Sequence, residues 1–216
     1  MLHLETIEPK TLELLNRIQS RPLLAETRLV GGTALALQLG HRISIDLDIF
    51  GKWDLEQSLD YELAQCGELV RIGGQKRLQF FSVDGVKVDC VTYDYPWLDE
   101  PIIESGVRIA GLPDIAAMKI NAITNRGTRK DFVDIAFLLK HYSLGQMFRY
   151  YLSKYADVEP AMALRSIVYF EDAEEMPMPR MLLPFDWEDA KNRIRSALRQ
   201  LEKSDILQAY PPKNGG

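Results

Sequence analysis

The spacing of apolar residues in the first half of the chain predicts short helices that alternate with short strands. Helical periodicity predicts helices at 10–20, 33–39 and 54–66, and short apolar or alternating runs predict strands at 45–50, 78–83 and 86–91. A shorter strand at Leu29 and Val30 ends at Gly31 and Gly32, and Gly40 is expected to stop the helix that follows. Asp84 and Gly85, between the last two strands, predict a hairpin turn.

After Gly111 the pattern becomes helical throughout. Helices are predicted at 113–124, 128–142, 144–156, 160–170 and 187–203, with an acidic, proline-bearing connection at 171–180. We therefore expect an α/β domain over residues 1–111 and a helical domain over residues 112–210. The last residues, 211–216, are expected to form a disordered tail.

Composition is that of a soluble globular protein. The chain has 216 residues, of which 46% are hydrophobic and 26% are charged, which suffices for a buried core. The net charge is -5 and the isoelectric point is near 5.3. A surface that coats nucleic acid broadly would be basic, so the charge argues against that class while leaving room for a local basic patch.

The sequence predicts a cytoplasmic protein without a membrane partner. Its N-terminus lacks the basic start and apolar run of a signal peptide, and no segment approaches the roughly 20 apolar residues of a membrane span. Cys66 and Cys90 are expected to be thiols, with Cys90 buried on a strand face, and nothing suggests a disulfide framework. Three widely separated histidines argue against a zinc site.

The most informative residues are Asp46 and Asp48, which lie two positions apart in the predicted strand 45–50. Side chains alternate between the faces of a strand, so Ile45, Leu47 and Ile49 are expected in the core and both aspartates on the other face. Two neighbouring carboxylates repel each other unless a cation lies between them, and Mg²⁺ prefers such oxygen ligands. The pair therefore indicates half of a metal site for phosphate chemistry, or alternatively the solvated face of an edge strand.

Gly31 and Gly32 lie where a strand ends and a helix begins. Glycine allows a phosphate to approach the backbone, and the first N–H groups of a helix point toward such an anion. A plain tight turn explains the two glycines better when they are taken alone, because so short a motif often occurs without a ligand. A phosphate-binding helix start beside a carboxylate pair, however, forms two parts of one nucleotide site.

Asp89 is the candidate third carboxylate. In the strand 86–91, Val86, Val88 and Cys90 form the inner face, and Asp89 lies on the other face with Lys87. If this strand lies beside 45–50, Asp89 can join the pair as a metal ligand or act as a general base. The alternative is a surface ion pair with Lys87.

Lys119 falls on an apolar stripe of the helix 113–124, roughly 140° from Asp114 on a helical wheel. A lysine in that position needs an anionic partner, such as a phosphate or a site carboxylate, or must extend its amine to solvent. Both interpretations stay open from the sequence.

The run from Thr128 to Asp134 combines a helix start with further charges. Thr128 and Asp131 have the spacing of a capping box, Asp131 and Asp134 share a helix face, and Lys130 can pair with Asp134. Capping and surface pairing explain most of this pattern without a function. One basic group is expected near the proposed nucleotide site: Arg126, Arg129 and Lys130. A second basic group is expected to form a solvated face of the last helix: Lys191, Arg193, Arg195, Arg199 and Lys203.

These residues resemble the AbiEii/AbiGii toxin family of nucleotidyltransferases, within the DNA polymerase β-like superfamily. The matching signature is the run Gly31 to Leu37, then His41 to Phe50 with both aspartates, then Asp89, Met118–Lys119 and Lys130 to Asp134. The region from Met176 to Trp187 also resembles the C-terminal part of the family. The first stretch is the most specific, and the resemblance covers most of the chain.

The resemblance implies an α/β (α+β) nucleotidyltransferase fold, with a mixed β-sheet flanked by helices, followed by a C-terminal helical domain. It implies transfer of a nucleoside monophosphate from an NTP co-substrate to an acceptor, with release of pyrophosphate and with Mg²⁺ or Mn²⁺ as cofactor. The expected acceptor is RNA, at the 3′ end of tRNA. The expected role is that of a toxin of a type IV toxin–antitoxin or abortive-infection system, with a cognate antitoxin as a possible partner. The alternatives are a protein NMPylating enzyme and a non-catalytic partner-binding protein.

The resemblance also assigns roles residue by residue. It implies that Asp46, Asp48 and Asp89 bind metal and that Lys119 contacts the nucleotide as a catalytic residue. Further nucleotide-binding residues are expected at Gly31, Gly32, Thr33, Lys130, Asp131 and Asp134. One departure is Gly32, where the wider superfamily has serine, so a hydroxyl contact to phosphate is missing unless Thr33 supplies it.

Overall fold

The computed structural model describes residues 1–53, 59–156 and 158–201. The chain divides into two compact units, the first formed by Met1–Tyr95 and Glu100–Gly111 and the second by Pro96–Asp99 and Leu112–Gly216. Part of the helix predicted at 54–66 and the whole tail predicted at 211–216 lie outside the described residues. Among the described residues, no helix is long and apolar enough to cross a membrane.

The described part of the first unit contains one mixed seven-stranded sheet in the order β3-β4-β5-β2-β1-β7-β6. The strands are β1 Arg28–Val30, β2 Leu47–Gly51, β3 Leu69–Gln75, β4 Leu78–Val83, β5 Val86–Thr92, β6 Ile102–Glu104 and β7 Val107–Ile109. The pairs β2–β5 and β1–β7 are parallel and the other pairs are antiparallel. The mixed sheet confirms the predicted fold class.

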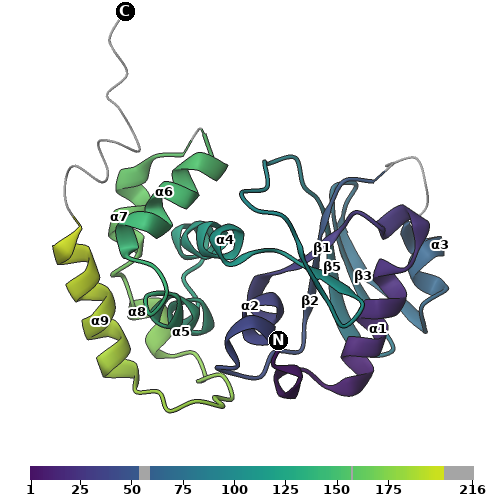
Figure 1. Ribbon diagram of the computed structural model, residues 1–216, viewed down its shortest axis with the longest axis horizontal. Coiled ribbons are helices and arrows are strands. Elements are labelled where there is room, and N and C mark those ends of the chain that lie inside the picture. Colours follow the sequence, from purple (N-terminus) through teal and green to yellow (C-terminus); the bar gives the residue numbers. More distant parts are fainter. Residues whose placement is uncertain (54–58, 157, 202–216) are drawn as a thin grey trace, which may run out of the picture. The chain divides into compact units, whose positions relative to one another are not determined.

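Helices cover this sheet and close its core. They are η1 Leu4–Thr6, α1 Pro9–Gln19, η2 Pro22–Leu24, α2 Gly31–Leu39 and α3 Leu59–Ala64. Figure 1 shows α1 and α3 along the same side of the sheet, and an ion pair of 2.6 Å joins Arg21, after α1, to Glu62 in α3. Leu14 and Ile18 of α1 are fully buried, and so are Val88 and Cys90 of β5, which confirms the predicted inner face of that strand.

The hairpin turn between β4 and β5 is confirmed. Asp84 has φ 51° and Gly85 has φ 79°, the two positive values that a tight turn of the predicted type requires. The prediction for Ile45 was wrong, because β2 begins only at Leu47 and the Ile45 side chain is 56% exposed. Asp46 therefore lies on the segment that leads into the strand.

Three strands were absent from the predictions. In β3 most residues are exposed, including Val70 and Ile72, and Gly73 and Gly74 interrupt any alternation. β6 and β7 have only three residues each, too few to show a period. β3 and β6 are the two edges of the sheet, where only one side of the backbone is paired.

The second unit is helical, as its periodicity predicted. Its elements are α4 Leu112–Asn125, α5 Arg129–Leu138, α6 Leu144–Lys154, α7 Pro160–Ser166, α8 Glu171–Glu174 and α9 Trp187–Gln200. α4 packs against α5, α6 and α7, and α5 packs against α9. The helices α5 and α7 end earlier than predicted, and the acidic connection contains the short helix α8.

Two local predictions for this unit were wrong. Thr128 is the N-cap of α5, but its hydroxyl donates to Asp131 Oδ2 at 2.5 Å and accepts no capping bond from the backbone. Lys191 is not on a solvated face: it is buried and bonds Glu174 at 2.5 Å and Glu188 at 2.6 Å. Arg193, Arg195 and Arg199 of the same helix are exposed, and Lys203 lies outside the described residues.

A buried ion pair fixes the segment 96–99 within the second unit. Lys154 Nζ lies 2.5 Å from Asp114 Oδ1 and donates to the carbonyl oxygen of Pro96 at 2.6 Å. The Asp114 carboxylate also accepts from the backbone N–H groups of Leu98, at 3.0 Å, and Asp99, at 3.2 Å. Both charged side chains are fully buried. On a helical wheel Asp114 falls with the polar Asn121 and Asn125, whereas in the structure it anchors a loop in the interior.

Candidate functional site

The glycine corner connects β1 to α2. Gly31 has φ 69°, a left-handed conformation that strains any residue with a Cβ. A Cβ built on Gly31 would overlap the carboxylate of Asp48, which faces Val30 across the β1–β2 ladder. At the other end of α2, Gly40 has φ 66° and its N–H bonds the Ala36 carbonyl at 2.8 Å, which confirms it as the helix stop. The corner therefore brings the start of a helix into contact with one of the predicted site carboxylates.

The two predicted carboxylate strands are neighbours in the sheet. β2 pairs with β5 in parallel, and Asp48 lies directly opposite Asp89. Both side chains are on the face of their strands opposite to the buried residues Leu47, Ile49 and Val88. Asp48 is thus adjacent to Asp89 on one side and to the glycine corner on the other. The sequence predicted this arrangement only on the condition that the two strands are neighbours.

Lys87 is paired with one member of this carboxylate group. Its Nζ lies 2.5 Å from Asp89 Oδ2. Burial would lower the pKa of Lys87, but the hydrogen bond to Asp89 and the charges of Asp89, Asp46 and Asp48 outweigh burial and raise the pKa above its usual value. The surface-pair alternative for Asp89 is therefore present in the structure. The negative charges of Asp46, Asp48 and Asp89 all act on Lys87, so the three carboxylates lie in one region around it.

The donor set fits a hard divalent cation in part. Asp89 Oδ1 is buried and, among the described residues, accepts no hydrogen bond, so one carboxylate oxygen is open to a further ligand. Oxygen donors are the ligands that Mg²⁺ prefers. In the part of the chain that the structure describes, however, no group of three or more His, Cys, Asp or Glu is close enough together to hold a metal ion. A cation held by all three aspartates would therefore need their carboxylates to move closer together.

The Thr33 hydroxyl is engaged by other groups of the protein. The side chain is buried, and its hydroxyl lies 2.5 Å from the carbonyl oxygen of Asp46 and 2.9 Å from Ser44 Oγ. The hydroxyl is therefore engaged by the segment that carries Asp46 and is turned away from solvent. Thr33 thus positions that segment against α2.

Sequence reasoning missed Arg42 as a site residue. Arg42 is buried, and a Cβ on Gly32 would overlap the end of its guanidinium group and approach Ser44 Oγ. A guanidinium beside the N-terminus of α2 adds a fixed positive charge to the helix dipole. The only signal in the sequence was the position of Arg42 between the glycines and the aspartates.

A second charged cluster lies in the helical unit and contains the remaining predicted residues. Lys119 Nζ contacts Asp131 Oδ1 at 2.9 Å and Asp134 Oδ2 at 2.6 Å, and all three side chains are buried. The predicted shared face of Asp131 and Asp134 is confirmed, and Lys119 is held by carboxylates instead of extending to solvent. Burial opposes ionisation of Asp131, but Lys119, Thr128 and Arg126 outweigh it and hold its pKa below the usual value.

A known family covers most of the chain. The family described as nucleotidyl transferase AbiEii toxin, of type IV toxin–antitoxin systems, matches residues 13–209. The chain belongs to the AbiEii family. It is therefore a nucleotidyltransferase of a toxin family, and the resemblance found in the sequence is confirmed.

The AbiEii protein is also similar in sequence to a bacterial relative and similar in fold to solved structures. A protein of Aquifex aeolicus (strain VF5), itself without an assigned function, is 35% identical over 170 residues, which cover 76% of this chain and 82% of that protein. JHP933 from Helicobacter pylori superposes with a TM-score of 0.55 at 17% identity, covering 96% of this chain and 94% of that one. MenT4, a nucleotidyltransferase toxin from Mycobacterium tuberculosis H37Rv, has a TM-score of 0.56 at 14% identity, covering 94% and 89%. These two structures share the fold.

Replacing Gly31 with Ala is expected to abolish most transferase activity of the AbiEii protein. The new Cβ would strain the backbone by about 1 kcal/mol and push the Asp48 carboxylate out of place. Gly85→Ala is the matched control, because Gly85 also has positive φ but a Cβ there would meet nothing within 4 Å. Gly31→Ala should lose at least as much stability as Gly85→Ala in thermal unfolding, because it adds the overlap with Asp48 to the backbone strain that both share, and only Gly31→Ala should lose transfer. Equal activity of the two variants would contradict the contact with Asp48.

Proposed function

We propose that this protein is the toxin of a type IV toxin–antitoxin or abortive-infection system and transfers a nucleoside monophosphate from an NTP to RNA, at the 3′ end of tRNA. The transfer depends on Mg²⁺ or Mn²⁺ and releases pyrophosphate. A cognate antitoxin is its expected regulatory partner, and the cytoplasm is its expected compartment. Membership of the AbiEii family supports the toxin and transferase parts of this proposal.

The observation that carries the proposal is the register of the central sheet. Asp48 is opposite Asp89 in the β2–β5 ladder and touches the glycine corner through Gly31. A carboxylate pair next to the first free N–H groups of a helix suits a triphosphate, whose anionic oxygens need both a cation and hydrogen-bond donors. In this proposal Asp46, Asp48 and Asp89 would hold the metal, and a bound metal would supply Lewis-acid stabilisation of the phosphoryl oxygens.

The residues of the glycine corner would orient the nucleotide. The N-terminus of α2, at Gly31 and Gly32, offers backbone N–H groups, and Arg42 adds a guanidinium beside Gly32. Arg42 would thus replace the hydroxyl that the Gly-Gly sequence lacks. Thr33 would act indirectly by holding the backbone at Asp46.

Lys87 would respond to the charge state of the carboxylate group. Its side chain is about half exposed (47%), so the amine can swing toward solvent when a divalent cation neutralises Asp89. A released Asp89 oxygen could then bind the metal or accept the proton of the attacking hydroxyl. The lysine would in this way keep the acidic group stable when no cation is bound.

The cluster of Lys119, Asp131 and Asp134 would bind the nucleotide in this proposal, together with Lys130. Its two carboxylates and one lysine form a rigid buried arrangement that fixes the start of α5. The exposed Arg126, 3.6 Å from Asp131, could add a phosphate contact. These roles rest on the likeness to the family signature.

The direct test is incubation of the purified protein with each α-³²P-labelled NTP, MgCl₂ and total RNA. We expect label in a nuclease-sensitive band, strongest with one NTP, and no label when EDTA replaces MgCl₂. A protease-sensitive band would instead support the protein NMPylating alternative, which the acidic isoelectric point favours. Absence of label with every NTP and acceptor would overturn the proposal.

A further inference from the structure

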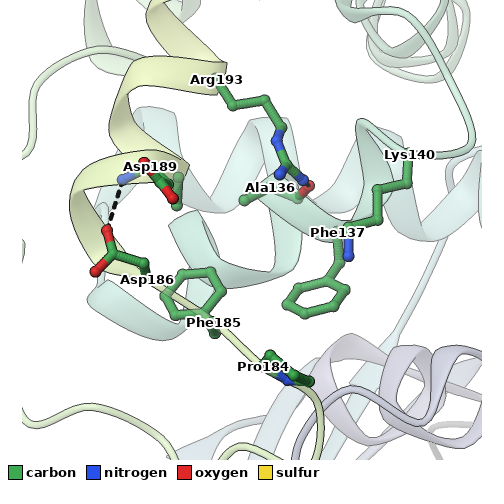
Figure 2. Close-up of a pocket in the computed structure, with 9 residues that line it drawn as sticks. Ala136, Phe137, Lys140, Pro184, Phe185, Asp186, Asp189 and Arg193 are labelled. Atoms are coloured by element: carbon green, nitrogen blue, oxygen red, sulfur yellow. Dashed lines mark hydrogen bonds between the residues drawn. The ribbon is translucent and has the colours of Figure 1, made fainter.

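A pocket of about 350 Å³ lies within the helical unit, between the C-terminal half of α5, the segment 184–186 and the first turns of α9. Its lining combines two aromatic rings with four charged side chains: Phe137, Phe185, Lys140, Arg193, Asp186 and Asp189. Figure 2 shows Arg193 extending from α9 toward Ala136 on α5, and Phe137 and Phe185 side by side beneath it. The volume is that of a small-ligand site. Phe185 and Asp186 lie in the region 176–187 that resembles the C-terminal part of the family, and none of the lining residues belongs to the carboxylate group of the sheet.

The base of the pocket is an aromatic surface. Phe137 is only 4% exposed and is stacked on Phe185, with ring centroids 5.9 Å apart and planes inclined by 19°. Lys140 Nζ lies 4.2 Å from the Phe137 ring centroid, so the lysine and Phe185 both pack against that ring. Phe185 is only half-buried, which leaves it as the ring on which a flat ligand could stack.

The charged side chains of the pocket are unevenly engaged. Asp186 caps α9 by accepting from the Asp189 N–H at 2.8 Å. Among the groups that the structure describes, Arg193 donates only to the Ala136 carbonyl oxygen, at 3.4 Å. Within the described residues, Lys140, Arg193 and the Asp189 carboxylate take part in no ion pair. Two cations and one carboxylate are therefore available to a ligand.

We propose that this pocket binds one unpaired nucleotide of the acceptor RNA, and that its base carries an exocyclic amino group. This inference rests on the proposed RNA acceptor. The four formal charges cancel, so the pocket is not built for a bare anion: a peptide carboxylate or free phosphate would leave the Asp189 carboxylate without a donor. A nucleotide suits every part of the lining: its uncharged base stacks on Phe185, the base amino group donates to Asp189, and its phosphate lies near Lys140 and Arg193.

The test is a binding measurement that needs neither NTP nor metal. Fluorescein-labelled oligoadenylate, oligocytidylate and oligouridylate are titrated with the full-length protein in EDTA, and anisotropy is followed. We expect tighter binding of oligoadenylate and oligocytidylate than of oligouridylate, which has no exocyclic amine. Phe185→Leu should weaken binding by about tenfold or more, because stacking is lost while apolar volume is kept. Asp189→Asn should remove most of the preference over oligouridylate.

Matched variants separate the pocket from general charge effects. Arg193→Ala should weaken binding several-fold, whereas Arg199→Ala, which removes the same charge from the exposed face of α9, should change it little. Circular dichroism of each variant confirms its fold. Wild-type protein that binds none of the oligonucleotides, Phe185→Leu that binds as wild type does, or equal effects of the two arginine variants would overturn the inference. If pocket-dependent binding appears but no label is transferred in the NTP assay, the catalytic proposal fails and this one stands.

Discussion

Asp48→Asn is expected to lower nucleotide transfer by about a thousandfold or more, because it removes a charged ligand at the position where the two carboxylate strands and the glycine corner meet. Asparagine keeps the shape of the side chain, so the packing against Gly31 is preserved. The melting temperature should stay level or rise, since Asp48 shares one region with Asp46 and Asp89 and loss of a charge relieves repulsion. Transfer is measured with labelled NTP, and unfolding with differential scanning fluorimetry.

Asp84→Asn is the matched control for this experiment. Asp84 lies at the β4–β5 turn, where its carboxylate bonds Arg17 at 3.0 Å and the Glu68 N–H at 2.8 Å, and asparagine tolerates its positive φ. These two hydrogen bonds hold the pKa of Asp84 below its usual value. The control should therefore lose some stability and keep its transfer activity, the reverse of Asp48→Asn. Full activity of Asp48→Asn would remove the carboxylate group from the mechanism.

The sequence predicted most of the fold because its strongest signals were local. Gly40 and the Asp84–Gly85 turn need backbone conformations that few residues adopt, and both are found as predicted. Helices of the second half carry long apolar stripes, so their existence was clear although several of their ends were not. Edge strand β3 escaped because most of its side chains are exposed and no apolar face forms.

Only part of the candidate site could be predicted from the sequence, because a local pattern does not show which strands are neighbours. Alternation placed Asp48 and Asp89 on the outer faces of their strands, but the parallel pairing that makes them adjacent is a long-range property. The engagement of Thr33 by the Asp46 carbonyl, and the approach of Arg42 to Gly32, depend on how the segment 41–46 folds back over α2. The spacing of residues within a short segment does not predict that the chain folds back in this way.

In the helical unit, too, the partner of a buried charged residue can be predicted only when it is close in sequence. A helical wheel identified Lys119 as a lysine that needs an anion, and the structure provides two, Asp131 and Asp134. The same wheel assigned Asp114 to a polar face because it could not include Lys154, which lies 40 positions later in the chain. An apparently polar residue can thus be an interior anchor when its partner is distant in sequence.

Lys154→Met is expected to destabilise the helical unit by about 3–5 kcal/mol, because it leaves the fully buried Asp114 carboxylate without its cation. The Pro96 carbonyl would lose a 2.6 Å hydrogen bond in the same variant. Stability is measured by urea unfolding followed through tryptophan fluorescence, which includes a local reporter, since Lys154 Nζ lies 4.7 Å from the Trp97 ring centroid. Lys140→Met, at an exposed position of the same unit, should change the free energy of unfolding by less than about 0.5 kcal/mol.

The double variant Asp114→Asn/Lys154→Met distinguishes a lost attraction from an isolated charge. If the large effect of Lys154→Met arises from the uncompensated carboxylate, neutralising Asp114 as well should recover part of the lost stability, and the two single effects should not add. The N–H groups of Leu98 and Asp99 bond different oxygens of Asp114, so asparagine can still accept from one of them through its single side-chain oxygen, and the loop 96–99 keeps part of its anchor. Strict additivity, or a Lys154→Met variant as stable as the wild type, would show that the ion pair does not hold this loop. Because Asp114 joins 96–99 to α4 and Lys154 joins the same segment to α6, the pair explains why these four residues belong to the helical unit although the chain on both sides belongs to the sheet unit.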